Sequence, residues 1–131
     1  MTEADTSLYD RLGGYDAISA VVHNLLPRLM ADAQLGRFWH NRGENGVERE
    51  RQLLINFLCN RAGGPIVYAG RDNVSTHRGM GITEGDWGRF IGHLKETLEH
   101  FEVPSAERTD VLAFIQSTKE DIVDKRRTDT Q

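Results

Sequence analysis

Several features are nearly or wholly missing from this sequence of 131 residues. Only Cys59 carries a thiol, which excludes an intrachain disulfide and a cysteine-rich zinc site. No run of about 18 apolar residues occurs, and the acidic N-terminus lacks the basic start of an export signal. Positive charge is not in excess, because 16 basic residues face 20 acidic ones. We therefore expect a soluble cytoplasmic domain that binds neither nucleic acid nor membrane.

Alternation of the kind that predicts a β-strand is also missing, whereas apolar residues recur at helical spacing in four blocks. The expected helices are 15–31, 47–61, 83–101 and 105–124. Pro27 falls inside the first of them and should bend it there. Thr83 and Asp86 resemble a capping pair at the start of the third. The sequence thus predicts an all-α fold.

The segment 63–82 does not fit a simple bundle of these helices. It is rich in glycine and has only a brief helical pattern, around residues 73–78. Such a long loop in a compact domain is either disordered or organised around something else, and a bound cofactor would explain it. We place one domain at residues 7–124 and expect the polar tails, 1–6 and 125–131, to fray.

Three motifs, taken in order, resemble the truncated haemoglobins of group I. They are LYDRLGG at 8–14, GGP at 63–65 followed by YAGR at 68–71, and HRGMGIT at 77–83. Each is weak alone, but their order and spacing are specific. The resemblance implies a two-over-two helical sandwich, in which helix pairs B/E and G/H enclose haem b, that is iron protoporphyrin IX. It also implies an extended loop before a very short F helix, which would account for the segment 63–82.

The resemblance implies that His77 is the proximal ligand of the haem iron. A neutral imidazole nitrogen can take that position when its other nitrogen is oriented by an acceptor. His23, His93 and His100 fall beside or opposite the apolar faces of their helices, so we expect them to be solvated. His40 follows two aromatic residues in a corner, where it could meet a propionate, act as a sixth iron ligand, or simply be exposed.

The distal side departs from the family pattern. Many group I members carry a tyrosine in helix B and a glutamine in helix E, whereas the corresponding places here hold Leu26 and Leu54. Bound dioxygen carries partial negative charge, so one donor is worth about 1.5–3 kcal/mol, and neither leucine can supply it. Glu50 takes the place of a gate residue and is expected to point to water. Gln52 or a trapped water remains the alternative donor.

The other expected pocket residues are mostly apolar or aromatic, and each is equally an ordinary core position. They are Phe38, Trp39, Leu53, Phe57, Leu58, Val74, Met80, Trp87, Phe90 and Ile115. Tyr68, Arg71 and Arg78 are expected to hold the propionates, because a guanidinium can bind a carboxylate through two hydrogen bonds.

The resemblance implies binding of O2, NO or CO at ferrous haem, and it allows the conversion of nitric oxide and oxygen to nitrate with an unidentified reductase. An apolar distal wall predicts weakly held oxygen, which favours delivery, nitric oxide handling or redox sensing over storage. We expect a monomer or a small homo-oligomer. The alternative is a cofactor-free helical module that binds a protein partner, with His77 incidental.

Overall fold

The computed structural model describes residues 7–40, 43–68, 77 and 80–124 of the chain. Within these ranges the chain forms helices and no strand, which confirms the all-α prediction. The elements in chain order are α1 (Leu8–Leu12), α2 (Gly14–Ala31), the 3-10 helix η2 (Leu35–Trp39), α3 (Glu44–Arg61), α5 (Glu84–His100), α6 (Ser105–Gln116) and α7 (Lys119–Ile122). The expected tails, 1–6 and 125–131, lie outside the described residues.

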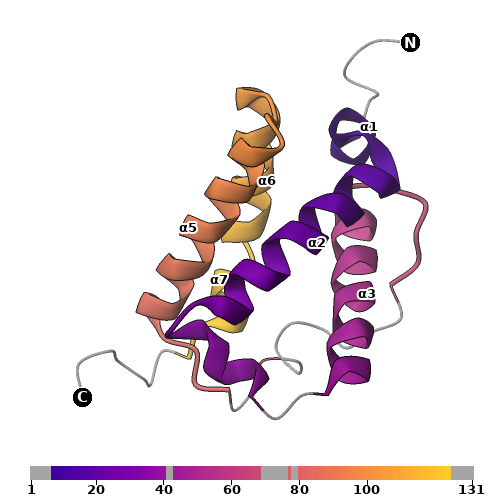
Figure 1. Ribbon diagram of the computed structural model, residues 1–131. Helices are drawn as coiled ribbons and strands as arrows, with labels where there is room; N and C mark the ends of the chain where they lie inside the picture. Colours follow the sequence, from indigo (N-terminus) through magenta and orange to yellow (C-terminus); the bar gives the residue numbers. More distant parts are fainter. Residues whose placement is uncertain (1–6, 41–42, 69–76, 78–79, 125–131) are drawn as a thin grey trace.

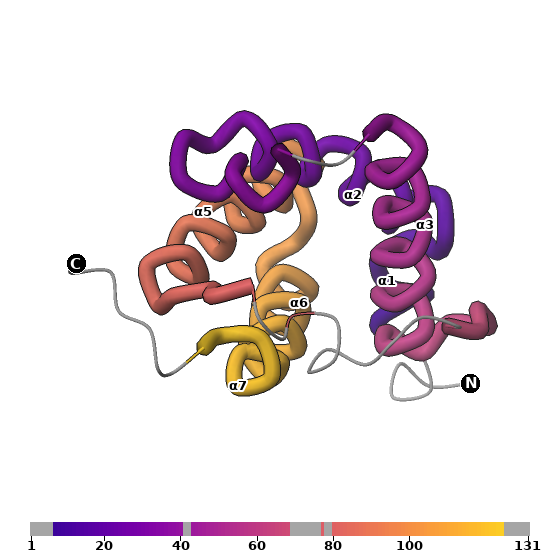
Figure 2. The backbone as a smooth tube through the Cα atoms, turned by 90° about the horizontal axis from the view of Figure 1, so that it is seen from below, coloured from indigo at the N-terminus to yellow at the C-terminus, as the bar shows by residue number. Residues whose placement is uncertain are grey.

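The long helix α2 organises the molecule, with α3 on one side of it and the α5–α6 pair on the other (Figure 1). Seen from below, α3 stands apart from α5, α6 and α7, and α2 and η2 span the two groups (Figure 2). This arrangement corresponds to two helix pairs, α2 with α3 and α5 with α6. We call helix α3 the α3 wall, and α5 with its neighbours α2 and α6 the α5 wall.

Three of the expected helices match single elements, while the fourth is divided. A break at Ser117 and Thr118 separates α6 from α7, and both hydroxyls there bond back to carbonyls three residues earlier, those of Phe114 and Ile115. Pro27 lies inside α2, which continues to Ala31 as one helix. The expected bend at Pro27 stays a prediction.

Two short elements were not predicted, because neither is long enough to show an apolar period. The first is α1, which begins where the Ser7 hydroxyl accepts the N–H of Asp10 at 3.1 Å. It ends at Gly13, whose φ of 108° suits glycine. Arg11 then ties α1 to α6 through Glu107 at 2.8 Å and Asp110 at 2.9 Å. The other short element is η2.

The glycine pair after α3 has a structural role of its own. Gly63 has a φ of 94°, and a Cβ on Gly64 would lie 2.5 Å from Cδ1 of Tyr9. The Tyr9 N–H also donates to the carbonyl of Ala62 at 2.9 Å. The first two sequence motifs therefore meet in space, since a tyrosine ring lies against a glycine at the end of α3.

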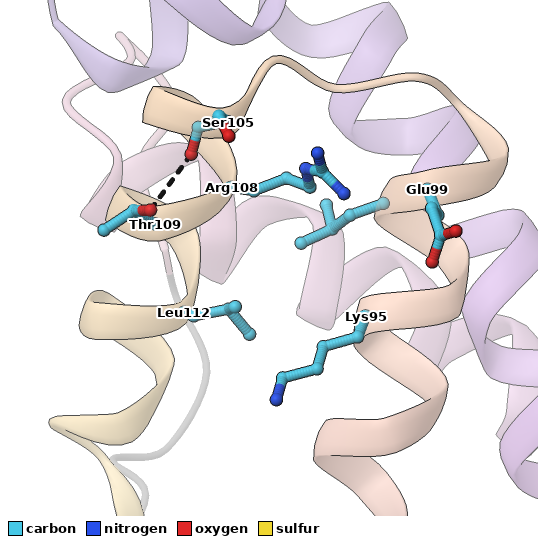
Figure 3. Close-up of a pocket in the computed structure, with 7 residues that line it drawn as sticks. Lys95, Glu99, Ser105, Arg108, Thr109 and Leu112 are labelled. Atoms are coloured by element: carbon cyan, nitrogen blue, oxygen red, sulfur yellow. Dashed lines mark hydrogen bonds between the residues drawn. The ribbon is translucent and has the colours of Figure 1, made fainter.

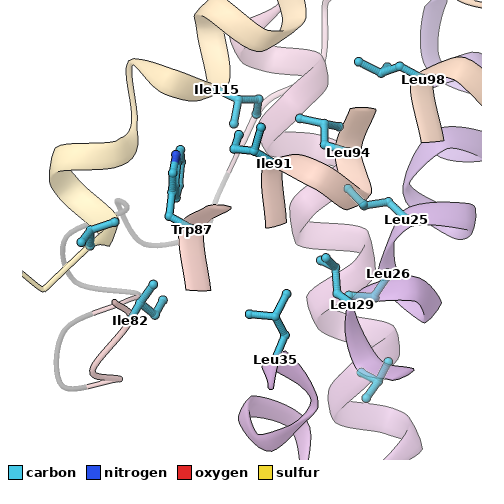
Figure 4. Close-up of a cluster of buried hydrophobic side chains, with 12 residues drawn as sticks. Leu25, Leu26, Leu29, Leu35, Ile82, Trp87, Ile91, Leu94, Leu98 and Ile115 are labelled. Carbon is cyan, nitrogen blue, oxygen red and sulfur yellow. The ribbon is translucent and has the colours of Figure 1, made fainter. Parts of the chain in front are cut away.

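The buried apolar side chains form two clusters. The main cluster joins α2, η2, the start of α3, α5, α6 and the residues after α7 (Figure 4). Its members are Leu25, Leu26, Leu29, Leu35, Val47, Ile82, Trp87, Ile91, Leu94, Leu98, Ile115 and Val123. The second cluster joins α2 to α3 and consists of Ile18, Val22, Ile55 and Cys59. None of the helices in the described part of the chain combines the length and the apolar character of a membrane span.

Candidate functional site

The wall formed by α2, α5 and α6 contains three of the predicted pocket residues in the main cluster. Leu26, Trp87 and Ile115 are 2%, 5% and 8% exposed. The indole N–H of Trp87 donates to Oε1 of Gln116 at 3.1 Å, which fixes the ring. Phe90 is half-buried, and its ring centroid lies 5.4 Å from that of Trp87. The structure thus brings these four residues together at the main cluster.

The corner η2 holds the two predicted aromatic residues of this region. Phe38 and Trp39 are half-buried, pack against the main cluster and meet edge to face with centroids 6.4 Å apart. Arg37 covers Phe38, with its guanidinium carbon 4.2 Å from the ring centroid. His40, at the end of η2, is exposed. Among the described residues, the buried indole N–H of Trp39 has no hydrogen-bond partner.

The predicted pocket residues on α3 do not all pack against the same cluster. Leu58 is half-buried and packs against both clusters, whereas Leu54 packs against the second cluster only. Leu53 and Phe57 are half-buried. The ring of Phe57 lies 5.3 Å from that of Tyr68 and 6.4 Å from that of Phe114 on α6, between centroids. A pair of aromatic rings therefore bridges the two walls.

Of the predicted proximal residues, His77 and Met80 are described. His77 is half-buried and helical, and its carbonyl accepts the N–H of Met80 at 3.2 Å. Met80 packs against the main cluster. One hydrogen-bonded backbone turn therefore links His77 to Met80, whose side chain packs against the main cluster. The predictions for Arg71, Val74 and Arg78 fall outside the described residues, as does most of the brief helical stretch expected at 73–78.

A buried carboxylate that the sequence did not reveal as part of the site fastens η2 to α5. Asp86 is 1% exposed and accepts hydrogen bonds from Arg37 Nη2 at 2.7 Å, Gln34 Nε2 at 2.5 Å and the Thr83 N–H at 3.0 Å. Burial alone would raise the pKa of Asp86, but the bonds from Arg37 and Thr83 outweigh it and lower that pKa. The predicted Thr83–Asp86 capping pair is confirmed, and it is extended by these partners from η2.

A second buried carboxylate, Asp32, fastens the end of α2 to α5. Its oxygens accept the N–H groups of Gln34 at 2.8 Å and Leu35 at 3.0 Å, and they contact Arg89 Nε at 3.0 Å and His93 Nε2 at 2.7 Å. The expectation that His93 is simply solvated was wrong, because its ring lies against this 5% exposed carboxylate. The bond from His93, followed by that from the Leu35 N–H, lowers the pKa of Asp32.

The two polar residues expected on the distal side, Gln52 and Glu50, differ in their burial. Gln52 is exposed, and its amide donates to the Tyr15 hydroxyl at 2.9 Å and to Asn56 Oδ1 at 3.0 Å. Its amide is therefore engaged at the surface, against α2, rather than in the main cluster. Glu50, which was expected to point to water, is half-buried.

A hollow of about 280 Å³ opens between α5 and α6 (Figure 3). It is lined by Lys95, Leu98, Glu99, Ser105, Arg108, Thr109 and Leu112. None of the predicted pocket residues is among them, so this hollow is separate from the candidate site.

The described side chains fit a flat, mostly apolar group with anionic edges. Half-buried aromatic and aliphatic residues on η2, α3 and α5 offer apolar contact, and His77 offers an imidazole nitrogen. The unpartnered N–H of Trp39 is suited to an acceptor atom at the corner. An imidazole nitrogen and apolar surroundings are what the binding of a haem requires.

Comparison with known proteins decides the family. The model of the bacterial-like globin family matches residues 7–124. The group 1 truncated hemoglobin GlbN of Mycolicibacterium paratuberculosis is 35% identical over 109 residues, which cover 83% of this chain and 78% of that one. The chain belongs to the group 1 truncated haemoglobins. As a member of this family it is a haem globin, and globins bind small gaseous ligands such as O2 at the haem.

The fold of this truncated haemoglobin agrees with solved structures. The Fe(III) form of truncated hemoglobin from Tetrahymena pyriformis superposes with a TM-score of 0.83 at 26% identity, covering 92% of this chain and 100% of that one. The group II truncated hemoglobin of Bacillus anthracis, as a Tyr26Ala mutant, also gives a TM-score of 0.83, at 16% identity and 95% coverage of both chains. The two-over-two sandwich expected from the sequence motifs is thus confirmed.

Proposed function

We propose that this truncated haemoglobin binds haem b with His77 as the proximal iron ligand and takes up O2, NO and CO at the opposite face. The observation that carries the proposal is the position of His77, which is one backbone turn before Met80 at the main cluster. The bound haem would supply reversible diatomic ligand binding and electron transfer. The chain would supply the ligand nitrogen, the apolar surroundings and access.

The haem would lie between the α5 wall and the α3 wall. Trp87, Phe90 and Ile115 would contact it from one side, and Leu58 with Phe57 from the other. Trp39 would close the corner, where its unpartnered indole N–H can donate to a propionate oxygen. Tyr68, Arg71 and Arg78 are the further propionate partners that we propose, because a phenol and two guanidinium groups suit carboxylates.

We also propose that the protein turns over nitric oxide. One NO, one O2 and one electron combine to nitrate, and a reductase would supply the electron. Leu26 and Leu54 support this role, because neither side chain can donate a hydrogen bond that would retain bound O2.

The test of haem binding is absorption spectroscopy on purified protein titrated with hemin. We expect a strong band at the blue edge of the visible that reaches its end point at one hemin per chain. His77→Ala should shift or abolish this band, whereas His100→Ala should not, since His100 is exposed on α5. A protein that ignores hemin would contradict the proposal, and so would an unchanged spectrum of His77→Ala.

A further inference from the structure

Arg51 is a charged residue on the buried face of α3. Val47 and Ile55, four residues before and after it, are 9% and 1% exposed, so helical geometry places Arg51 on the same face. Val47 belongs to the main cluster and Ile55 to the second cluster. Arg51 therefore lies at the junction of the two apolar clusters, where a guanidinium is uncommon.

The guanidinium of Arg51 has an ion-pair partner at Nη1 but no hydrogen-bond partner at Nε among the described residues. Nη1 pairs with Oε1 of Glu48, which is largely exposed, while the side chain of Arg51 itself is only 20% exposed. Nε is fully buried and has no hydrogen-bond partner in the part of the chain that the structure describes. A buried donor left unpaired is costly, so such a group calls for an acceptor that the protein itself does not provide.

The neighbours of Arg51 relate this donor to the proposed ligand side of the haem. Leu54 follows three residues later and is its neighbour along the helix, and Leu26 on α2 shares the main cluster with Val47. Leu26 and Leu54 are the two positions at which a distal donor is missing, and the amide of Gln52 is engaged at the surface with Tyr15. Among the described residues of α3, Arg51 is thus the positively charged donor on the buried face.

We propose that Arg51 is the specificity-determining donor of this globin, and that its Nε–H donates to a diatomic ligand bound at the open side of the haem. This inference rests on the proposed haem binding. Glu48 acts as a positioning residue, because it holds Nη1 at the exposed end of the guanidinium while Nε stays buried. A fixed positive donor favours ligands that gather negative charge, O2 above all, over CO. Oxygen is then held more firmly than Leu26 and Leu54 alone would predict.

The experiment compares Arg51→Met with Arg49→Met in the haem-loaded protein. Arg49 is exposed on the same helix and serves as the matched control. We expect Arg51→Met to raise the infrared C–O stretching frequency of the CO complex, because a positive donor near the CO oxygen lowers it. Oxygen dissociation should become roughly ten- to hundredfold faster. Arg49→Met should leave both values unchanged.

The stability of the haem-free variant shows whether Arg51 serves as a ligand donor or only stabilises the fold. The urea midpoint of haem-free Arg51→Met should equal or exceed that of the unaltered protein, because an apolar side chain replaces a buried charge.

If Arg51→Met does not fold, Arg51→Lys, which lacks the Nε donor, should raise the C–O stretch by a smaller amount. An unchanged stretch and oxygen dissociation in a folded, haem-loaded variant would overturn the role of Arg51 alone. Faster haem loss with an unchanged stretch would assign Arg51 to a propionate and overturn it too. An unaltered protein that binds no haem would overturn the proposed function as well.

Discussion

The α5 wall and the α3 wall are held in different ways. The α5 wall is fully buried where it meets α2, and two carboxylates, Asp32 and Asp86, fasten it to the end of α2 and to η2. On the α3 wall the predicted pocket residues are half-buried, and the deeply buried residues Ile55 and Cys59 belong to the second cluster. The side that follows His77 is thus fastened by charged hydrogen bonds, whereas the opposite side rests mainly on apolar contacts with α2.

The largest expected effect contrasts a leucine from each wall. Leu94 on α5 is 4% exposed in the main cluster, so Leu94→Ala should lower the free energy of unfolding by about 2–5 kcal/mol. Leu54 on α3 is half-buried, and Leu54→Ala should cost about half as much. Urea denaturation of both variants measures the difference. Equal losses would remove the contrast between the two walls.

The next effect tests the carboxylate that fastens η2 to α5. Asp86→Ala removes an acceptor from Arg37, Gln34 and the Thr83 N–H, which should cost about 2–4 kcal/mol of unfolding free energy. Glu99→Ala is the control on the same helix, because Glu99 is exposed and should change stability by no more than about 0.5 kcal/mol. A loss for Asp86→Ala as small as that of the control would show that η2 is held by apolar packing alone.

A smaller effect concerns the loss of stability at low pH, to which Asp32 contributes. The pKa of Asp32 is lower in the folded protein than in the unfolded chain, since His93 and the Leu35 N–H bond to its charged form. The stability that this carboxylate contributes is therefore present above its unfolded pKa, near 4 by ordinary values, and is lost as pH falls toward the folded value. Asp32→Asn should weaken the decline of unfolding free energy below about pH 4. Parallel pH profiles for both proteins would contradict this assignment.

Much of this structure could be predicted from the sequence because it depends on local patterns. Apolar periodicity located the long helices, and Thr83 with Asp86 marked the start of α5 within one turn. The motif at residues 77–83 singled out His77, while its role as a ligand stays a prediction. Such features need no knowledge of distant segments.

What could not be predicted depends on contacts between distant residues. Arg37 and Asp86 are 49 residues apart, and His93 meets Asp32 across 61, so neither pair has a signature in the local sequence. Arg51 stands in a run of charged residues that reads as a solvated face, and its burial becomes visible only once α3 lies against α2. The element η2 is likewise too short for any periodic signal.

The central claim is that His77 holds the haem iron, and the most direct test is resonance Raman spectroscopy of the ferrous, ligand-free protein. We predict an iron–imidazole stretching band in the unaltered protein, its loss in His77→Gly, and its return when free imidazole is added to that variant. An iron–imidazole band that persists in His77→Gly without added imidazole would contradict the claim, because another histidine would then be the ligand.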